Sequence, residues 1–129
     1  MKTTILITLI IANIFSAHAD EMKSPLDTSV LIGTWKLDLS PHDSSDANFA
    51  IMKVHRIDEN GFYGEFYRDG VTIQKGQINT QTHKIHAALI SQDNSGSYNS
   101  SFYFHDGMLY GSTHAVDRDF LAVWSATKE

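Results

Sequence analysis

Histidine is the residue type in this chain best suited to binding a metal or moving a proton. The chain has seven histidines, and the closest pair is His83 and His86. On a β-strand, residues three positions apart point to opposite faces, so this pair cannot chelate one ion as it could on a helix. The chain has no cysteine, and no carboxylate flanks a histidine pair on one face. We therefore expect no metal site and no cofactor.

Ser112, His114 and Asp117 are the nearest approach to a nucleophile, a base and an orienting carboxylate. Ser112 and His114 would share one face of a strand, with Asp117 in the loop that follows. Three common residues near a loop do not specify catalysis, because the chemistry depends on their mutual geometry. No catalytic residues are predicted, and binding is favoured over enzymatic activity.

Glu65 lies between Tyr63 and Tyr67 in a segment of alternating residues. If Phe62, Gly64 and Phe66 face the core, Glu65 faces solvent. In the opposite orientation Glu65 would be buried, and burial would raise its pKa. The sequence leaves the two orientations open, although the charge favours the first.

Aromatic side chains are the remaining candidates for binding a ligand. We expect them first of all to fill the interior of a small domain, because protein interiors are close-packed. A ligand pocket would be lined by such rings together with a few polar groups. The predicted ligand-binding residues are Phe66, Tyr98, Ser100, Phe102 and Trp124, chosen from an inventory that also contains Trp35, Phe49, Phe62, Phe104 and Phe120.

Short apolar segments separated by turn signals must position these residues. Asn60-Gly61, Asp69-Gly70 and Asp106-Gly107 suit the positive φ of tight hairpin turns, so neighbouring strands should be antiparallel. No segment has the length and periodicity of a three-turn helix. The eight predicted strands are Leu31–Leu39, Phe49–Ile57, Phe62–Tyr67, Val71–Ile78, Lys84–Ile90, Tyr98–Phe104, Met108–Thr113 and Phe120–Thr127.

The fold predicted from this pattern is all-β: a small eight-stranded antiparallel up-and-down β-barrel. Closure hides the strand edges, and an interior of this size is either filled by side chains or holds one small ligand. A two-sheet β-sandwich is the alternative. Whether the barrel is hollow or packed stays open at this point.

Ile32-Gly33-Thr34-Trp35, at the start of the first strand, resembles the Gly-x-Trp start of lipocalins and the Gly-Thr-Trp start of avidin-type barrels. Both belong to the calycin group, so the resemblance implies a small ligand-binding barrel. It also implies that Lys128, near the end of the closing strand, packs over Trp35 at one end of the barrel. Leu37 occupies the place of a biotin-contacting polar residue, so biotin binding is not implied.

The first 19 residues read as a secretory signal peptide. Met1-Lys2 supplies the positive start, Ile5 to Phe15 is apolar, and Ala17-His18-Ala19 is a small-x-small cleavage site. The apolar run is too short for a membrane span, so none is expected after cleavage. We predict a signal peptide over residues 1–19, a flexible lead-in over 20–29 and a single barrel domain over 30–129. The expected location is the periplasm or the medium.

Composition supports one exported domain without disulfides. The 129 residues are 42% hydrophobic and include no cysteine, so packing alone must stabilise the fold. Fifteen acidic residues against ten Lys plus Arg give a net charge of −5. Without a basic stretch, nucleic acid is not an expected partner.

Two functions of different class follow. The first is an exported lipocalin-like barrel that binds a small apolar or aromatic ligand. The second is an exported structural or interaction protein whose packed barrel binds another protein through its loops or outer face. A cavity of a few hundred Å3 favours the first. An exposed apolar patch favours the second, and the oligomeric state is left open.

Overall fold

Eight antiparallel strands, each hydrogen-bonded to the next, form the computed structural model, which describes residues 25–129. β8 pairs with β1, with Trp35 opposite Lys128, so the sheet closes on itself. This closed structure confirms the predicted eight-stranded antiparallel up-and-down barrel and excludes the sandwich. The strands are β1 (Gly33–Asp38), β2 (Phe49–Asp58), β3 (Gly61–Tyr67), β4 (Ile73–Asn79), β5 (His86–Asp93), β6 (Gly96–His105), β7 (Met108–Ala115) and β8 (Phe120–Lys128).

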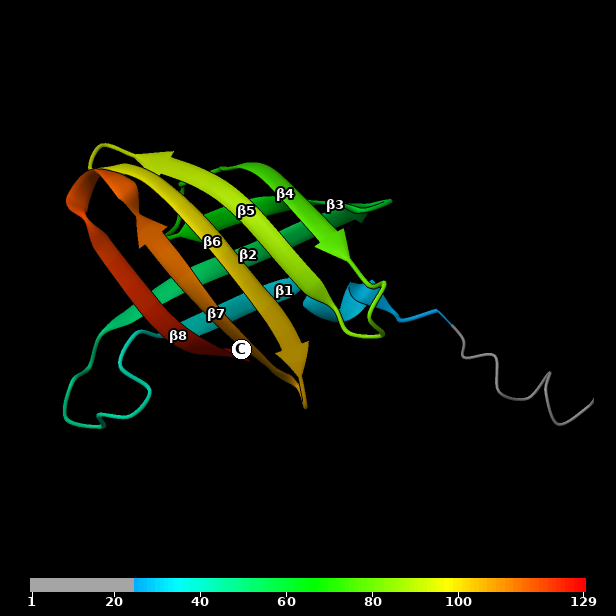
Figure 1. The fold of residues 1–129 in the computed structure, drawn as a ribbon, viewed down its shortest axis with the longest axis horizontal. Coiled ribbons are helices and arrows are strands. Elements are labelled where there is room, and N and C mark those ends of the chain that lie inside the picture. The colour runs from blue at the N-terminus through cyan, green and yellow to red at the C-terminus, as the bar shows by residue number, and fades with distance from the viewer. Residues whose placement is uncertain (1–24) are drawn as a thin grey trace, which may run out of the picture.

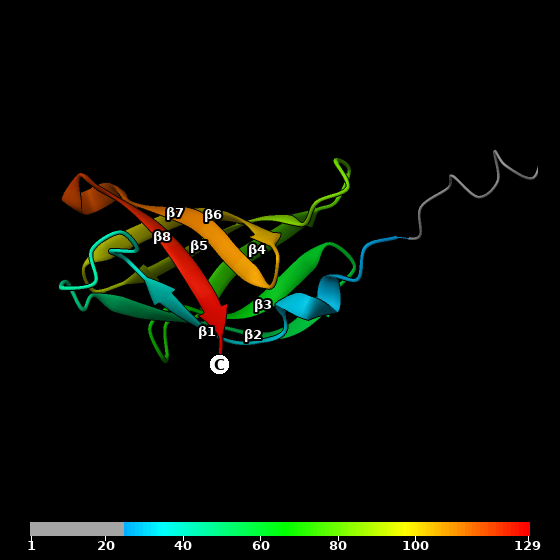
Figure 2. The same ribbon diagram turned by 90° about the horizontal axis from the view of Figure 1, so that it is seen from below.

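The barrel is flattened into two layers (Figures 1 and 2). β1 to β3 lie on one side and β5 to β7 on the other, with β4 and β8 joining them. A 3-10 turn, η1 (Thr28–Leu31), lies at one end of the barrel. A second, η2 (Val116–Arg118), lies at the opposite end, so the two ends carry different caps.

Alternating side chains build the core as strand periodicity predicts. In β3, Phe62 and Phe66 are buried and Tyr63 and Glu65 are not. In β8, the preferred inward set holds for Ala122, Trp124 and Ala126. The buried hydrophobic residues form one cluster: Leu31, Trp35, Leu37, Ala50, Met52, Val54, Phe62, Phe66, Ile73, Ile78, Ile85, Ala87, Leu89, Tyr98, Phe102, Leu109, Ala115, Ala122, Trp124 and Ala126.

Two aromatic residues expected in the interior lie outside it. Phe49 is 49% exposed, because Ala50, Met52 and Val54 take the inward positions of β2. Its ring instead lies 4.1 Å below the Lys36 ammonium, measured to the ring centroid. Phe120 is 52% exposed at the very start of β8, where the barrel wall begins. For both residues, the interior prediction was wrong.

The strand ends and one turn differ in detail from the predicted ones. The first strand begins at Gly33 rather than Leu31, because Asp27 caps η1 by accepting a hydrogen bond from the Ser29 amide. β5 continues to Asp93, since Ser91 is fully buried and extends the alternation. The turn after β2 places its positive φ on Glu59 rather than on Gly61.

The turn between β6 and β7 has the predicted form. Asp106 and Gly107 both have positive φ, and His105 pairs with Met108 across the two-residue loop. Further along β7, a Cβ on Gly111 would lie 2.7 Å from the Trp124 ring and 2.6 Å from the Ser101 carbonyl oxygen. The absent side chain therefore lets the indole cross beneath β7.

The predicted signal peptide, residues 1–19, lies outside the described residues. Within residues 25–129, no helix has the length and apolarity needed to span a membrane.

Candidate functional site

The five predicted ligand-binding residues all point into the barrel and are brought together by the fold. The Trp124 ring centroid lies 6.2 Å from that of Phe66 and 5.9 Å from that of Phe102. Tyr98 and Ser100 lie on β6 beside Phe102, and all five are almost fully buried. The Phe66 and Phe102 rings therefore pack against Trp124, so side chains occupy the interior beside the indole.

Polar groups inside the barrel are arranged as a short chain. The Trp124 Nε1–H donates to Thr113 Oγ1 over 3.0 Å, and Thr113 Oγ1 lies 2.8 Å from Ser100 Oγ. Ser91 Oγ is also buried, but has no hydrogen-bond partner among residues 25–129. The indole N–H of Trp124 therefore has a hydrogen-bond acceptor, whereas the Ser91 hydroxyl is unpaired within the described residues.

Trp35 and Leu31 close one end of the barrel. Trp35 is 1% exposed, and its Nε1–H donates to the Leu31 carbonyl oxygen over 2.8 Å. The Lys128 ammonium lies 5.2 Å from the centroid of the Trp35 ring. This end is blocked by an indole, a 3-10 turn and a cation.

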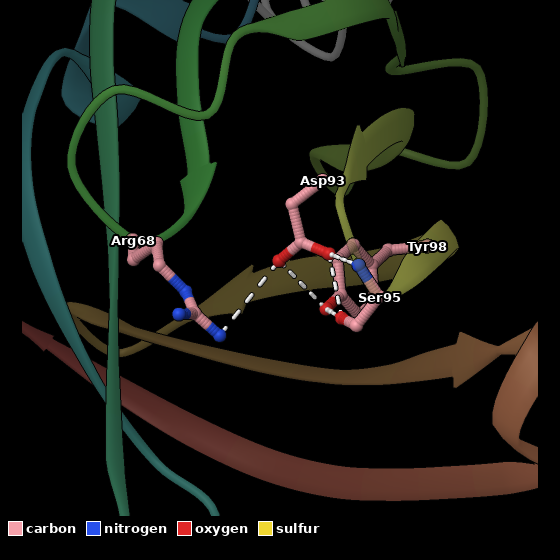
Figure 3. A network of polar contacts seen from close by, with 4 residues as sticks. All are labelled: Arg68, Asp93, Ser95 and Tyr98. Atoms are coloured by element: carbon pink, nitrogen blue, oxygen red, sulfur yellow. Dashed lines mark hydrogen bonds and ion pairs between the residues drawn. The ribbon is translucent and has the colours of Figure 1, made fainter.

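The opposite end is closed by two stacked tyrosines and by a carboxylate network, the second of which is drawn in Figure 3. The Tyr67 and Tyr98 rings stack with centroids 5.3 Å apart, and the Arg118 guanidinium lies 5.7 Å from the Tyr98 centroid. Asp93 accepts hydrogen bonds from the Tyr98 hydroxyl over 2.9 Å and from the Ser95 hydroxyl over 2.6 Å. Neither end offers the open mouth expected of a ligand-binding barrel.

The same network sets two pKa values. Hydrogen bonds from Ser95, then from Tyr98, and the nearby Arg68 guanidinium at 3.7 Å lower the pKa of Asp93. Partial burial raises the pKa of Tyr67, against the opposing effect of Arg118. Asp93 is therefore held as a carboxylate, and Tyr67 as a neutral phenol.

Glu65 faces outward, which settles the orientation that the sequence left open. Its carboxylate accepts a hydrogen bond from the Gly70 amide over 2.8 Å and lies 3.1 Å from His55 Nε2. These hydrogen bonds, the Gly70 one first, lower the pKa of Glu65 rather than raising it. Glu65 anchors the β3–β4 turn.

A large hollow lies on the outside of the barrel, across β4 to β8. Its volume is about 1030 Å3. Most of its lining consists of the outward side chains of the five strands, and the loop residues Pro41 and His42 border its β8 end. Of the predicted ligand-binding residues, Phe102 and Trp124 contribute to this lining, from the inner side of the sheet.

Strand register arranges the lining of this hollow in rows. Ala88, Ser101 and Ser112 are neighbours on β5, β6 and β7 and form a floor of small side chains. One step along the strands, His86, Tyr103 and Tyr110 form a parallel row of rings. One step the other way, Ile90 on β5 pairs with Asn99 on β6, and these two residues border a smaller, second hollow. We call the floor together with its row of rings the trough.

The rings of the aromatic row pack against one another. The Tyr103 and Tyr110 rings stack with centroids 5.5 Å apart, and His86 lies 6.1 Å from Tyr103. A second hollow, of about 330 Å3, continues the trough over β4 to β6 toward Lys75. Together they make a long concave surface with a flat aromatic side.

The outer face that carries the trough has no formal charge. At the outward positions of β5 to β8, residues 86–127, there is no Asp, Glu, Lys or Arg. The other layer is different: Lys36, Lys53, Arg56 and Glu65 all point outward from β1 to β3. The trough is therefore suited to uncharged groups.

Sequence reasoning did not identify the trough residues as a site. Tyr103, Tyr110 and Ser101 fall on the solvent side of the alternation, so they were not candidates. One signal was available: the outward half of the alternation is free of charge over four consecutive strands.

The histidines do not gather into a metal centre. His83 lies in the turn before β5, with positive φ, and His86 begins the strand. No group of three or more His, Asp or Glu side chains able to hold an ion occurs within residues 25–129. Ser112 and His114 both face outward on β7, where Ser112 belongs to the trough floor.

Comparisons with known proteins add one structural likeness. No protein-family model matches the chain, and no curated protein matches it. A crystal structure of a mutant of the fluorescent protein UnaG is similar, with 17% sequence identity and a TM-score of 0.41. The alignment covers 80% of this chain and 99% of that one.

Proposed function

We propose that this chain is an exported barrel protein that binds a small ligand with an apolar or aromatic face, and that the ligand lies in the trough. The observation that carries the proposal is the trough itself. Its volume of about 1030 Å3 is the size of a small-molecule site, and rings with a few polar groups line it.

The trough suits a ligand better than the interior does. A ligand beside Trp124 would have to displace Phe66 and Phe102, which already pack against it. Entry would also require opening either the Trp35 end or the Tyr67–Tyr98 end. The trough needs no displacement, because its rings and floor are already exposed to solvent.

Binding of the uncharged fluorescent dye N-phenyl-1-naphthylamine tests the proposal. We expect its emission to rise on binding, and Tyr103→Ala to weaken binding at least tenfold by removing the centre of the aromatic row. Tyr63→Ala is the matched control, because Tyr63 is an exposed tyrosine, 44% accessible, on the opposite layer. Absence of binding, or equal affinity in wild type and Tyr103→Ala, would contradict the proposal.

The alternative, a packed barrel that binds an exported protein, uses the same face. It is supported by Leu121 and Val123, which are 61% and 63% exposed on β8, where Val123 lines the trough. The dye titration separates the two functions. If the face binds only another protein, it need not bind the dye, and Tyr103→Ala need not weaken dye binding.

Export is the part of the proposal that rests on the first 19 residues alone. N-terminal sequencing of the product should give Asp20-Glu21 as the mature start. A membrane-bound product with Met1 intact would contradict export without affecting the trough.

A further inference from the structure

The floor of the trough carries hydroxyl groups that the protein itself leaves free. Gln77, Asn79 and Tyr110 use side-chain atoms in hydrogen bonds to their own strand or the following turn. By contrast, the hydroxyls of Ser101 and Ser112 bond to no other residue of the described chain. A wholly apolar ligand on this floor would strip water from them and leave them unpaired, which is unfavourable. The floor therefore suits a ligand that carries hydroxyls of its own.

The absence of charged side chains in the lining restricts the chemical class of the ligand further. No Asp, Glu, Lys or Arg lines the main hollow. A charged ligand would lose hydration there without gaining an ionic partner. The nearest cation along the trough is Lys75, which borders only the smaller hollow at the β4 end. The ligand is expected to be uncharged.

The aromatic wall provides a second type of contact with a ligand, by packing against its apolar parts. Tyr103 and Tyr110 stack at 5.5 Å and are flanked by His86 at 6.1 Å from Tyr103. Flat π surfaces of this kind pack against another flat face, apolar or weakly polarised. A sugar ring presents such a face through its C–H bonds, with hydroxyls around its edge. The floor and the wall together match both parts of a sugar.

The length of the trough indicates a chain of sugars rather than one. It crosses five strands, and neighbouring strands lie ~4.8 Å apart, so its length is ~19 Å. The row of rings lies two residues from the floor, roughly 7 Å along the strands. The trough is therefore longer than it is wide, and Pro41 and His42 border one end of it.

We infer that the trough binds an uncharged oligosaccharide, with sugar C–H groups against the exposed parts of the Tyr103 and Tyr110 rings and hydroxyls on Ser101 and Ser112. This inference rests on the proposed function and names the class of its ligand.

Isothermal titration of the full mature chain with cellohexaose, maltohexaose and chitohexaose tests the inference. At least one of the three should bind, and glucose or N-acetylglucosamine should bind at least tenfold more weakly. Hexagalacturonate, of similar length but anionic, should bind at least tenfold more weakly than the best neutral hexamer. Tyr103→Ala should reduce affinity at least tenfold and Ser101→Val severalfold, whereas Tyr63→Ala should leave it unchanged.

The outcomes separate this inference from the proposed function. If none of the neutral hexasaccharides binds but N-phenyl-1-naphthylamine still binds in a Tyr103-dependent way, the oligosaccharide inference is overturned and the trough site stands. If neither class of probe binds, both fail. Hexasaccharide binding that Tyr103→Ala does not weaken would also overturn the inference. Circular dichroism of each variant checks that the barrel is folded.

Discussion

Tyr103 and Tyr110 lie directly opposite each other on β6 and β7, with ring centroids 5.5 Å apart and ring planes 25° from parallel. The pair is held outside the barrel, where each ring covers part of the other. Tyr110 is held further by a contact of 3.6 Å from its hydroxyl to the Met108 sulfur. Since neither ring has to move to present a flat surface, the aromatic wall of the trough is preformed, and a ligand loses little affinity to ordering it.

Trp35→Ala should destabilise the protein strongly. The ring is 1% exposed and its removal leaves a large cavity at the η1 end, so the expected loss is about 3–5 kcal/mol. Lys128→Ala should cost only about 0.5–1 kcal/mol, the usual contribution of a solvent-exposed cation over an aromatic ring. Urea melts of both variants measure the difference. Small, nearly equal losses would mean that Trp35 does not plug the barrel.

Thr113→Val should be destabilising although valine fits the space. It removes the acceptor of the Trp124 Nε1–H and the partner of Ser100, and a buried donor left unpaired costs roughly 1–3 kcal/mol. Thr127→Val is the matched control, because Thr127 is exposed on the same face of the sheet as the trough. Equal stability of the two variants in denaturant would argue against the internal polar chain.

Ser91→Ala should stabilise the protein. Ser91 Oγ is fully buried and has no partner among the described residues, so removing it eliminates a desolvated hydroxyl and should gain about 1 kcal/mol. Ser101→Ala, on the exposed floor of the trough, should change stability by less than about 0.5 kcal/mol. A loss of stability in Ser91→Ala would show that the hydroxyl has a partner in solution.

Acid should weaken the fold through Asp93. Its pKa is lowered in the folded state, chiefly by the Ser95 hydroxyl, so its contribution to stability is present above the unfolded pKa of about 3.9 and is lost as pH falls through the lower, folded value. Asp93→Asn should therefore reduce stability at neutral pH and flatten its fall below about pH 4. Thermal melts between pH 7 and pH 2 measure both effects. An identical pH dependence in the variant would exclude Asp93 as a contributor.

Strand periodicity made the barrel and most of its inward residues predictable. Phe62, Phe66, Phe102 and Trp124 follow from alternation, because a period of two assigns every second side chain to the core. Phe49 shows where hydrophobicity misleads. Its position puts it outside the barrel in step with Ile51 and Lys53, although its ring suggested the interior.

The trough could not be predicted in the same way, because it is made by register between strands rather than by any one strand. Ser101 and Ser112 are eleven positions apart in the chain and become neighbours only when β6 and β7 pair through the Asp106-Gly107 turn. Ala88 joins them through a second pairing. Each residue alone is an ordinary surface side chain, and only the lack of charge across four strands is visible in the sequence.

Methyl-detected NMR during titration with N-phenyl-1-naphthylamine tests most directly that the ligand binds in the trough and not inside the barrel. Ala88 and Val123 place methyl groups on the trough side of the sheet, whereas Leu89, Leu109 and Ala126 place theirs in the core. We expect the largest shifts at Ala88 and Val123, with small shifts at the three core residues. Largest shifts at Leu89, Leu109 and Ala126 would contradict the trough and place the ligand in the interior.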